Sequence, residues 1–226
     1  MKSLLFIACF LLIGCYSFSQ ISRPEEPDYK QIEKNISKPD SQFFYPDLFE
    51  RYKRADTTLT LEERRHLYYG YSFDPDYSPY GHSDYSDSLN IVLKKDSINE
   101  ADILCIQRFG DSILSDFPFD LRVLEYQGYA LEYKGKTKEL ENKIRQIGII
   151  LDAIFSSGDG TSKKDAFYVI YTSHEYFILN MLGLQFTSQS LIDHYDYMEV
   201  ADNEYGIEGF YFDVSPCLNS MKNMFK

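Results

Sequence analysis

The adjacent residues His174 and Glu175 are of types that could support catalysis. A histidine followed by a glutamate begins the zinc-protease motif His-Glu-x-x-His, in which the histidines bind zinc and the glutamate acts as general base. The second histidine would stand at position 178, which is an isoleucine. The pair therefore predicts a structural or surface contact, and the alternative is acid–base chemistry by His174 and Glu175 alone.

A second polar group lies between positions 193 and 202. It contains one histidine and four acidic residues: Asp193, His194, Asp196, Glu199 and Asp202. Alternate residues of a strand share a face, so Asp196 would lie beside His194. Cation binding is one interpretation of this pattern. The favoured interpretation is a solvated edge strand whose charges discourage pairing with other chains.

The remaining motifs give no indication of a cofactor. The segment SSGDGT at 156–161 has the composition of a phosphate loop. A phosphate loop follows a strand and opens a helix, whereas this segment follows a predicted helix and precedes a predicted strand, so it predicts a turn. The sequence has no Cys-x-x-Cys pair, no nucleophile elbow and no dinucleotide-binding glycine loop. We therefore expect no cofactor and no metal site.

A turn-rich stretch carries four residues that could form a binding surface: Tyr77, Tyr80, His82 and Tyr85. Tyrosine offers a rigid ring with a polar tip, which suits a contact surface. The alternative is that the stretch folds back and its rings fill gaps over neighbouring helices. Half-buried tyrosines of that kind are common, so the second interpretation is favoured.

The sequence contains four cysteines, of which Cys9 and Cys15 fall in an N-terminal apolar segment. Cys105 lies on the apolar side of a predicted helix, which favours a buried free thiol. The alternative is a Cys105–Cys217 disulfide, formed in an oxidising compartment and closing a long loop.

Residues 1–19 have the pattern of an export signal, with Lys2 followed by an apolar run and then small residues before Gln20. The run is too short to cross a bilayer as a helix. The Leu-Ile-Gly-Cys sequence that ends at Cys15 also resembles a lipobox, so the alternative to cleavage before Gln20 is lipidation of Cys15. We expect an exported protein, periplasmic or secreted, or alternatively lipid-anchored to the outer membrane.

The composition limits the class of partner. The chain has 226 residues, 44% of them hydrophobic, and a formal net charge of -12. The hydrophobic content is enough for a core. The acidic balance argues against nucleic acid, because phosphates require a basic surface. The expected partner is an unidentified protein or envelope component.

Helices are predicted over most of the first 158 residues. Residues 20–42 are polar and proline-containing and predict a flexible leader, with one or two helical turns at Ile32 and Ile36. Pro46 favours a short helix that ends near Arg54. Further helices are expected from capping boxes at Thr60–Glu63 and Ser97–Glu100, from Asp120 to Gly135, and from Thr137 to Gly158. The connection 82–97 holds a brief apolar run at 89–93.

The pattern changes after residue 165 to short runs that favour strands. Strands are predicted at 166–171, 189–192, 197–201 and 209–214, with a hairpin turn at 203–208 and a closing helix at 216–225. The run 176–182 is ambiguous between strand and helix. Helices followed by strands indicate an α+β fold in one domain over 43–226. The helical part (43–158) is expected to pack either like tetratricopeptide repeats or as an ordinary bundle. A small antiparallel sheet (165–226) follows it.

Several of these stretches together resemble a known family. They are RYKRADTTLTLEERRHLYYGY at 51–71, SGDGTSKKDAFYVI at 157–170, HEY at 174–176 and GFYFDVS at 209–215. The chain is similar to domain-of-unknown-function family forty-nine nineteen, exported proteins of Bacteroidetes. The resemblance implies an envelope protein and supplies no catalytic residue. The function we expect is a non-enzymatic binding or scaffold module, and the alternative is an envelope hydrolase or other enzyme that uses His174 and Glu175.

Overall fold

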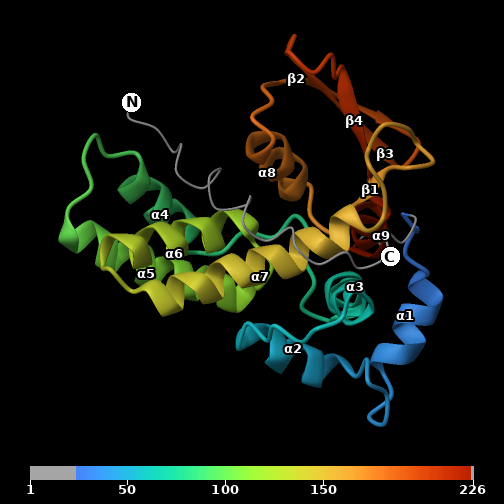
Figure 1. Ribbon diagram of the computed structural model, residues 1–226, viewed down its shortest axis with the longest axis horizontal. Coiled ribbons are helices and arrows are strands. Elements are labelled where there is room, and N and C mark those ends of the chain that lie inside the picture. The colour runs from blue at the N-terminus through green and yellow to red at the C-terminus, as the bar shows by residue number, and fades with distance from the viewer. Residues whose placement is uncertain (1–23, 225–226) are drawn as a thin grey trace.

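The computed structural model describes residues 24–224. The predicted export signal, including Cys15, lies outside the described residues. The helices are α1 (Tyr29–Ile36), α2 (Tyr45–Lys53), α3 (Leu61–Gly70), a short 3₁₀ turn η1 (Tyr71–Phe73), α4 (Ser86–Leu93), α5 (Glu100–Asp116), α6 (Leu121–Tyr133), α7 (Thr137–Phe155), α8 (Ser173–Met181) and α9 (Ser215–Met224). The strands are β1 (Phe167–Tyr168), β2 (Phe186–Ile192), β3 (Tyr195–Val200) and β4 (Gly209–Asp213). Helices come first and most strands follow, so the α+β class is confirmed (Figure 1).

Helices α4 to α7 form a stack on one side of the molecule, and α7 continues from this stack towards the sheet (Figure 1). The expected start of α5 at Ser97 is wrong by two residues, because Asn99 and Asp102 form the capping box instead. Gly110 permits the close approach of α5 to α6: a side chain there would lie 2.4 Å from Nε2 of Gln127. The Gln127 amide in turn donates to the Gln107 carbonyl oxygen, 2.8 Å away, and so joins the two helices.

Helix α3 lies at the junction of α1, α2 and α7. Its predicted capping box is confirmed, since Thr60 accepts from the Glu63 amide and Glu63 accepts from the Thr60 amide. Leu67, Tyr68 and Tyr69 are fully buried. A helix of ten residues is marginal in water by itself, so this buried face is what holds α3 in place.

The predicted helical turns at Ile32 and Ile36 form helix α1. Both isoleucines are buried in the main core. Asp28 caps α1 by accepting from the Gln31 amide. Two isoleucines one turn apart give this otherwise polar helix a face to bury.

The sheet has the order β1-β4-β3-β2. It is mixed rather than purely antiparallel, because β1 pairs with β4 in parallel while the other pairs are antiparallel. β1 is much shorter than the predicted strand 166–171. The ambiguous run 176–182 is part of helix α8, and the apolar run 89–93 is part of helix α4.

One hydrophobic core joins the helical part to the sheet. It contains Leu67 and Ile150 from the helices together with Phe167 and Phe212 from the strands. A second, smaller cluster, which includes Ile103 and Ile106, lies among α4, α5 and α6. None of the described helices combines the length and the apolar content needed to cross a membrane.

Candidate functional site

His174 lies in the first turn of α8 and is fully buried. Its Nε2 is 2.9 Å from the carbonyl oxygen of Phe119, and its Nδ1 is 2.7 Å from the hydroxyl of Tyr68. A carbonyl oxygen can only accept, so Nε2 carries the proton and Nδ1 accepts from Tyr68. The Tyr68 hydroxyl also accepts from the Ile170 amide, 3.2 Å away. This chain of hydrogen bonds fixes a neutral imidazole, and burial lowers the pKa of His174 to about 4.

Glu175 is also fully buried, and no described donor reaches either of its carboxyl oxygens. A second acid, Asp196 of β3, is close enough to act on the pKa of Glu175. Two neighbouring carboxyl groups do not both ionise readily, because their like charges repel. Burial first, and then the Asp196 carboxyl, raise the pKa of Glu175 to about 10, so the proton resides on Glu175. The amide of Gln189 donates to Asp196 at 2.7 Å and favours its charged form.

This arrangement makes the His174–Glu175 pair a structural centre. The sequence predicted either a structural or a surface contact for this pair. Both side chains are 0% exposed, so the contact is a structural one. His174 bonds to Tyr68 of α3 and to Phe119 in the turn before α6. Glu175 lies close to Asp196 of the sheet. General acid–base chemistry requires hydrogen-bond reach to a substrate. A neutral histidine with both nitrogens engaged by the protein offers no such reach.

Tyr77 points inwards rather than forming a surface. Its hydroxyl donates to the carbonyl oxygen of Ile170, 2.5 Å away, and its ring packs on Tyr71 and Tyr171. The thiol of Cys217 donates to the same carbonyl oxygen at 3.3 Å. Tyr77 therefore folds back and fills a gap over its neighbours, as the favoured interpretation of this stretch expected.

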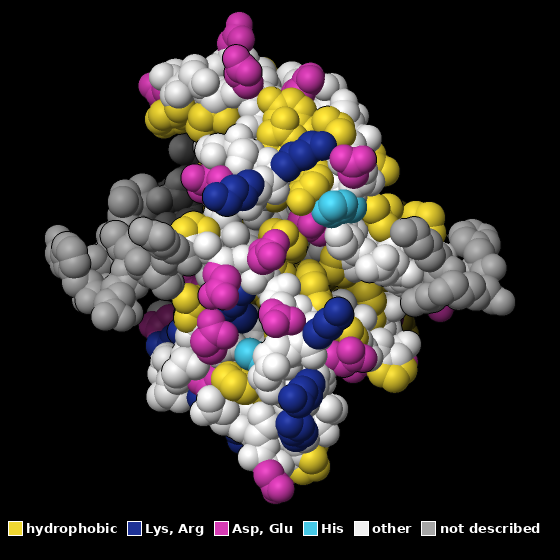
Figure 2. Space-filling view, turned by 90° about the vertical axis from the view of Figure 1, so that its right-hand side faces the viewer, with side chains coloured by type: hydrophobic (Ala, Val, Ile, Leu, Met, Phe, Trp, Pro, Cys, Tyr) yellow, Lys and Arg dark blue, Asp and Glu magenta, His cyan; other side chains and the backbone are white. Residues whose placement is uncertain are grey.

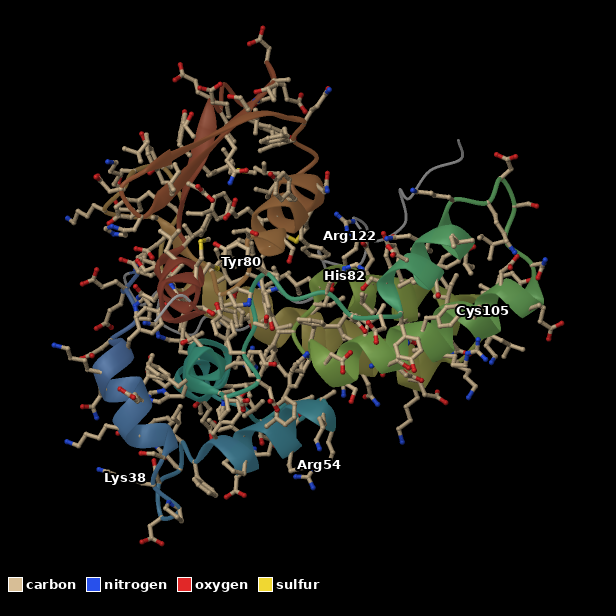
Figure 3. All side chains as sticks on the ribbon, turned by 180° about the vertical axis from the view of Figure 1, so that it is seen from behind. Lys38, Arg54, Tyr80, His82, Cys105 and Arg122 are labelled. Carbon is tan, nitrogen blue, oxygen red and sulfur yellow. The ribbon has the colours of Figure 1, made fainter. Side chains whose placement is uncertain are left out.

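Tyr80, His82 and Tyr85 remain exposed but do not converge. The connection from α3 to α4 carries Tyr80 and His82 across the back of the molecule (Figure 3). His82 lies 3.7 Å from the carboxylate of Asp87. Tyr85 stacks on Phe109 of α5, with ring centroids 6.2 Å apart.

Both described cysteines are free thiols. Cys105 is half-buried against the smaller cluster in α5, whereas Cys217 is buried in the main core. The alternative Cys105–Cys217 disulfide is not formed in this structure. Cys105, for which burial was predicted, is only half-buried, whereas Cys217 is fully buried.

The polar residues of 193–202 also diverge. Asp193 pairs with Lys163 at 3.2 Å, and His194 pairs with Asp213 at 3.3 Å. The expected edge strand is wrong, because β2 pairs with the outer side of β3 and leaves β3 inside the sheet. Within residues 24–224, no three His, Cys, Asp or Glu side chains are close enough to share a metal ion.

A groove of about 490 Å³ opens at the side of α2, where four segments meet. Its walls come from α2, from the 3₁₀ turn and the loop after it, and from the end of α5 and the turn into α6. The aromatic lining includes Tyr45, Phe49 and Tyr71, and the acidic lining is Asp74, Asp76 and Asp116. Volumes of 300 to 1,000 Å³ are typical of small-molecule sites.

The acidic groups of the groove are not neutralised by the protein. None of Asp74, Asp76 and Asp116 forms an ion pair with any described residue; Asp74 accepts from the Asp76 amide, and Asp116 accepts from the Ser83 hydroxyl. All ten lining residues are acidic, aromatic, serine or proline. On the face shown in Figure 2, by contrast, acidic and basic side chains are interspersed.

One hydroxyl in the groove has no partner. The Tyr45 hydroxyl is buried and makes no hydrogen bond to a described residue. Buried polar groups in folded proteins are normally satisfied, so such a group requires an explanation. Burial raises the pKa of Tyr45, which keeps the hydroxyl neutral and able to donate or accept.

The sequence did not predict this groove. Asp74 and Asp76 immediately precede the turn-rich stretch, whereas Tyr45 and Phe49 lie in α2, far from it in the chain. An available signal was the pair of aspartates, Asp74 and Asp76, on either side of a proline. Asp116 carries no comparable signal, because only the packing of α5 brings it to this loop.

Comparison with known proteins gives one match. Neither a curated protein nor a solved structure matches the chain. The family model described as a domain of unknown function, DUF4919, matches residues 30–223. That range includes both the His174–Glu175 centre and the whole groove, and the protein therefore belongs to the DUF4919 family.

Proposed function

We propose that this protein is an exported envelope protein that binds a ligand without converting it, and that the acidic, aromatic groove is its binding site. The observation that carries the proposal is the contrast between two places. His174 and Glu175 are 0% exposed, and both His174 nitrogens are engaged by the protein. The groove is open and holds three unpaired carboxylates.

Catalysis by His174 and Glu175 is the competing function, and the geometry gives it little support. A substrate would have to displace Tyr68 or Phe119 from His174, or separate Glu175 from Asp196. Each displacement leaves a buried polar group unpaired, which costs about 1 to 3 kcal/mol per group.

Export is the second part of the proposal, supported by the residues before Gln20. Lys2, the apolar run and the small residues after it form the pattern of an export signal. The intact mass of the protein purified from its native host distinguishes the two processing routes. A chain that begins at Gln20 supports cleavage, an acylated Cys15 supports a lipid anchor, and a mature chain that retains Met1 contradicts export.

Binding without turnover is tested by co-sedimentation with purified envelope fractions, followed by mass spectrometry of the bound material. We expect reversible binding, chemically unchanged material, and equal binding by Glu175→Gln and His174→Gln variants that remain folded. A product that accumulates with the wild-type protein and is lost in the folded Glu175→Gln variant would establish the enzymatic alternative.

A further inference from the structure

We propose that the groove binds a linear organic polyamine, a small molecule whose ammonium groups are separated by methylene chains. The inference rests on the proposed function and specifies its ligand class. Three features of the groove support it: the charge of its lining, the origin of its acidic groups in two segments, and its aromatic walls with the Tyr45 hydroxyl.

The charge of the lining selects a cation. Asp74, Asp76 and Asp116 contribute three carboxylates without a neutralising ion pair. Lys53 lies beside this lining, with its ammonium group over the Phe49 ring, 5.4 Å from the ring centroid. Lys53 itself pairs with Glu50 at 2.5 Å, so it does not offset the aspartates.

The placement of the acidic groups on two segments favours an extended cation over a metal ion. The three aspartates are not among any described group of acidic, histidine or cysteine side chains close enough to share one ion. They belong to the loop after the 3₁₀ turn and to the end of α5, and both segments line the groove. A ligand that satisfies them needs at least two positive charges set apart from each other.

The aromatic walls suit the methylene chain and its charges. Phe49, Tyr71 and Phe117 supply ring surface between the carboxylates. Ammonium groups are attracted to aromatic faces, and methylene groups gain from contact with them. The Tyr45 hydroxyl, which has no partner among the described residues, can accept a hydrogen bond from an ammonium group that binds beside it.

The test is calorimetric titration of the full mature chain with spermidine at low ionic strength. The Asp76→Asn/Asp116→Asn double variant removes two charges from the groove. Its matched control is Glu33→Gln/Asp40→Asn, which removes two exposed charges near α1 that form no recorded ion pair. We expect the groove variant to lose about tenfold in affinity, as for two exposed ion pairs, and the control to bind as the wild type does.

A second pair of variants tests the hydroxyl. Tyr45→Phe removes a group without an intramolecular partner, so its thermal stability should be unchanged while spermidine affinity falls by about threefold, as for one hydrogen bond. The matched control is Tyr29→Phe, since the Tyr29 hydroxyl is also buried and unpartnered but is not part of the groove lining. We expect Tyr29→Phe to bind normally.

Four results would overturn the inference: no binding of spermidine, equal losses in the groove and control variants, binding of uncharged octanediol as tight as that of spermidine, or tighter binding of a trilysine peptide. The last would indicate a basic polypeptide as the occupant. None of these four results decides the envelope co-sedimentation test, which does not depend on spermidine. Chemical conversion of spermidine, in contrast, would contradict the proposed function itself.

Discussion

Burial moves the pKa values of His174 and Glu175 in opposite directions, and both side chains become neutral. The pKa of His174 falls to about 4 from 6.5, and the pKa of Glu175 rises to about 10 from 4.5. Between 4.5 and 10, native Glu175 holds a proton that the unfolded chain has lost, so this residue makes stability fall as pH rises. His174 has the opposite effect between about 4 and 6.5, where the unfolded chain binds the extra proton.

The wild type and Glu175→Gln both contain His174, so its contribution cancels in their difference and Glu175 can be observed by itself. We expect the free energy of unfolding of the wild type, relative to that of Glu175→Gln, to fall between about pH 6.5 and about pH 8 by up to about 1.4 kcal/mol per pH unit. Glutamine has the shape of the protonated acid and an amide that can donate to Asp196.

The measurement is urea unfolding of both proteins at several pH values, with exposed Glu33→Gln as the control. A difference between wild type and Glu175→Gln that does not change with pH would show that Glu175 is ionised in the folded protein.

The outcome at residue scale shows what a local pattern can and cannot predict. The missing second histidine at position 178 was sufficient to argue against zinc. The partners of His174 were not predictable, because Tyr68 and Phe119 are 106 and 55 positions away in the chain. Asp196 was expected beside His194 on one strand, but His194 lies in the turn before β3 and pairs with Asp213, while Asp196 lies within β3 and acts on Glu175.

At the scale of elements, the loop between the 3₁₀ turn and α4 contains a half-buried tyrosine, Tyr77, and an exposed one, Tyr80. Tyr77 packs on the main core and donates to Ile170, whereas Tyr80 is 45% exposed. Tyr77→Ala should therefore cost about 2 to 4 kcal/mol, similar to Leu67→Ala in α3, because each removes a packed side chain from the core.

Tyr80→Ala is the matched control for Tyr77→Ala, and it should cost no more than about 1 kcal/mol, as is usual for exposed positions. Urea unfolding midpoints measure all three variants. Equal costs for the two tyrosines would mean that the loop is not attached to the core through Tyr77.

Elements with a strong local signal were predicted well from the sequence. Thr60 and Glu63 cap α3 as expected, and α6 and α7 begin within a residue of the predicted positions. Short apolar runs were predicted poorly, as at 89–93 and 176–182, because length and periodicity do not distinguish a short helix from a strand. The start of α5 moved because Asn99 caps as well as serine does and is nearer to the apolar face.

At the scale of the whole molecule, the helical part and the sheet share one core. Phe119 from the turn before α6 is fully buried against Tyr68, and α7 contacts β1. We therefore expect a single unfolding transition, with the same midpoint by far-ultraviolet circular dichroism and by tyrosine fluorescence. Limited proteolysis that yields two separately stable fragments, divided near residue 160, would contradict this expectation.

The α+β class followed from the change of pattern near residue 165, but the sheet order did not. The parallel pairing of β1 with β4 depends on the return of the chain after α8 and the β2–β3 hairpin. Such long-range pairing leaves no local signature. The groove was hidden for the same reason, since α2, the loop after α3 and the end of α5 meet only in the folded chain.

The central claim is that ligand binds in the groove while the His174–Glu175 centre stays closed. Amide chemical-shift mapping of the labelled protein during titration with spermidine tests it most directly. We predict shifts confined to α2, to residues 71–78 and to residues 115–118, with the amides of α8 and β3 unchanged. Shifts centred on His174, Glu175 and Asp196, with the groove unaffected, would contradict the account.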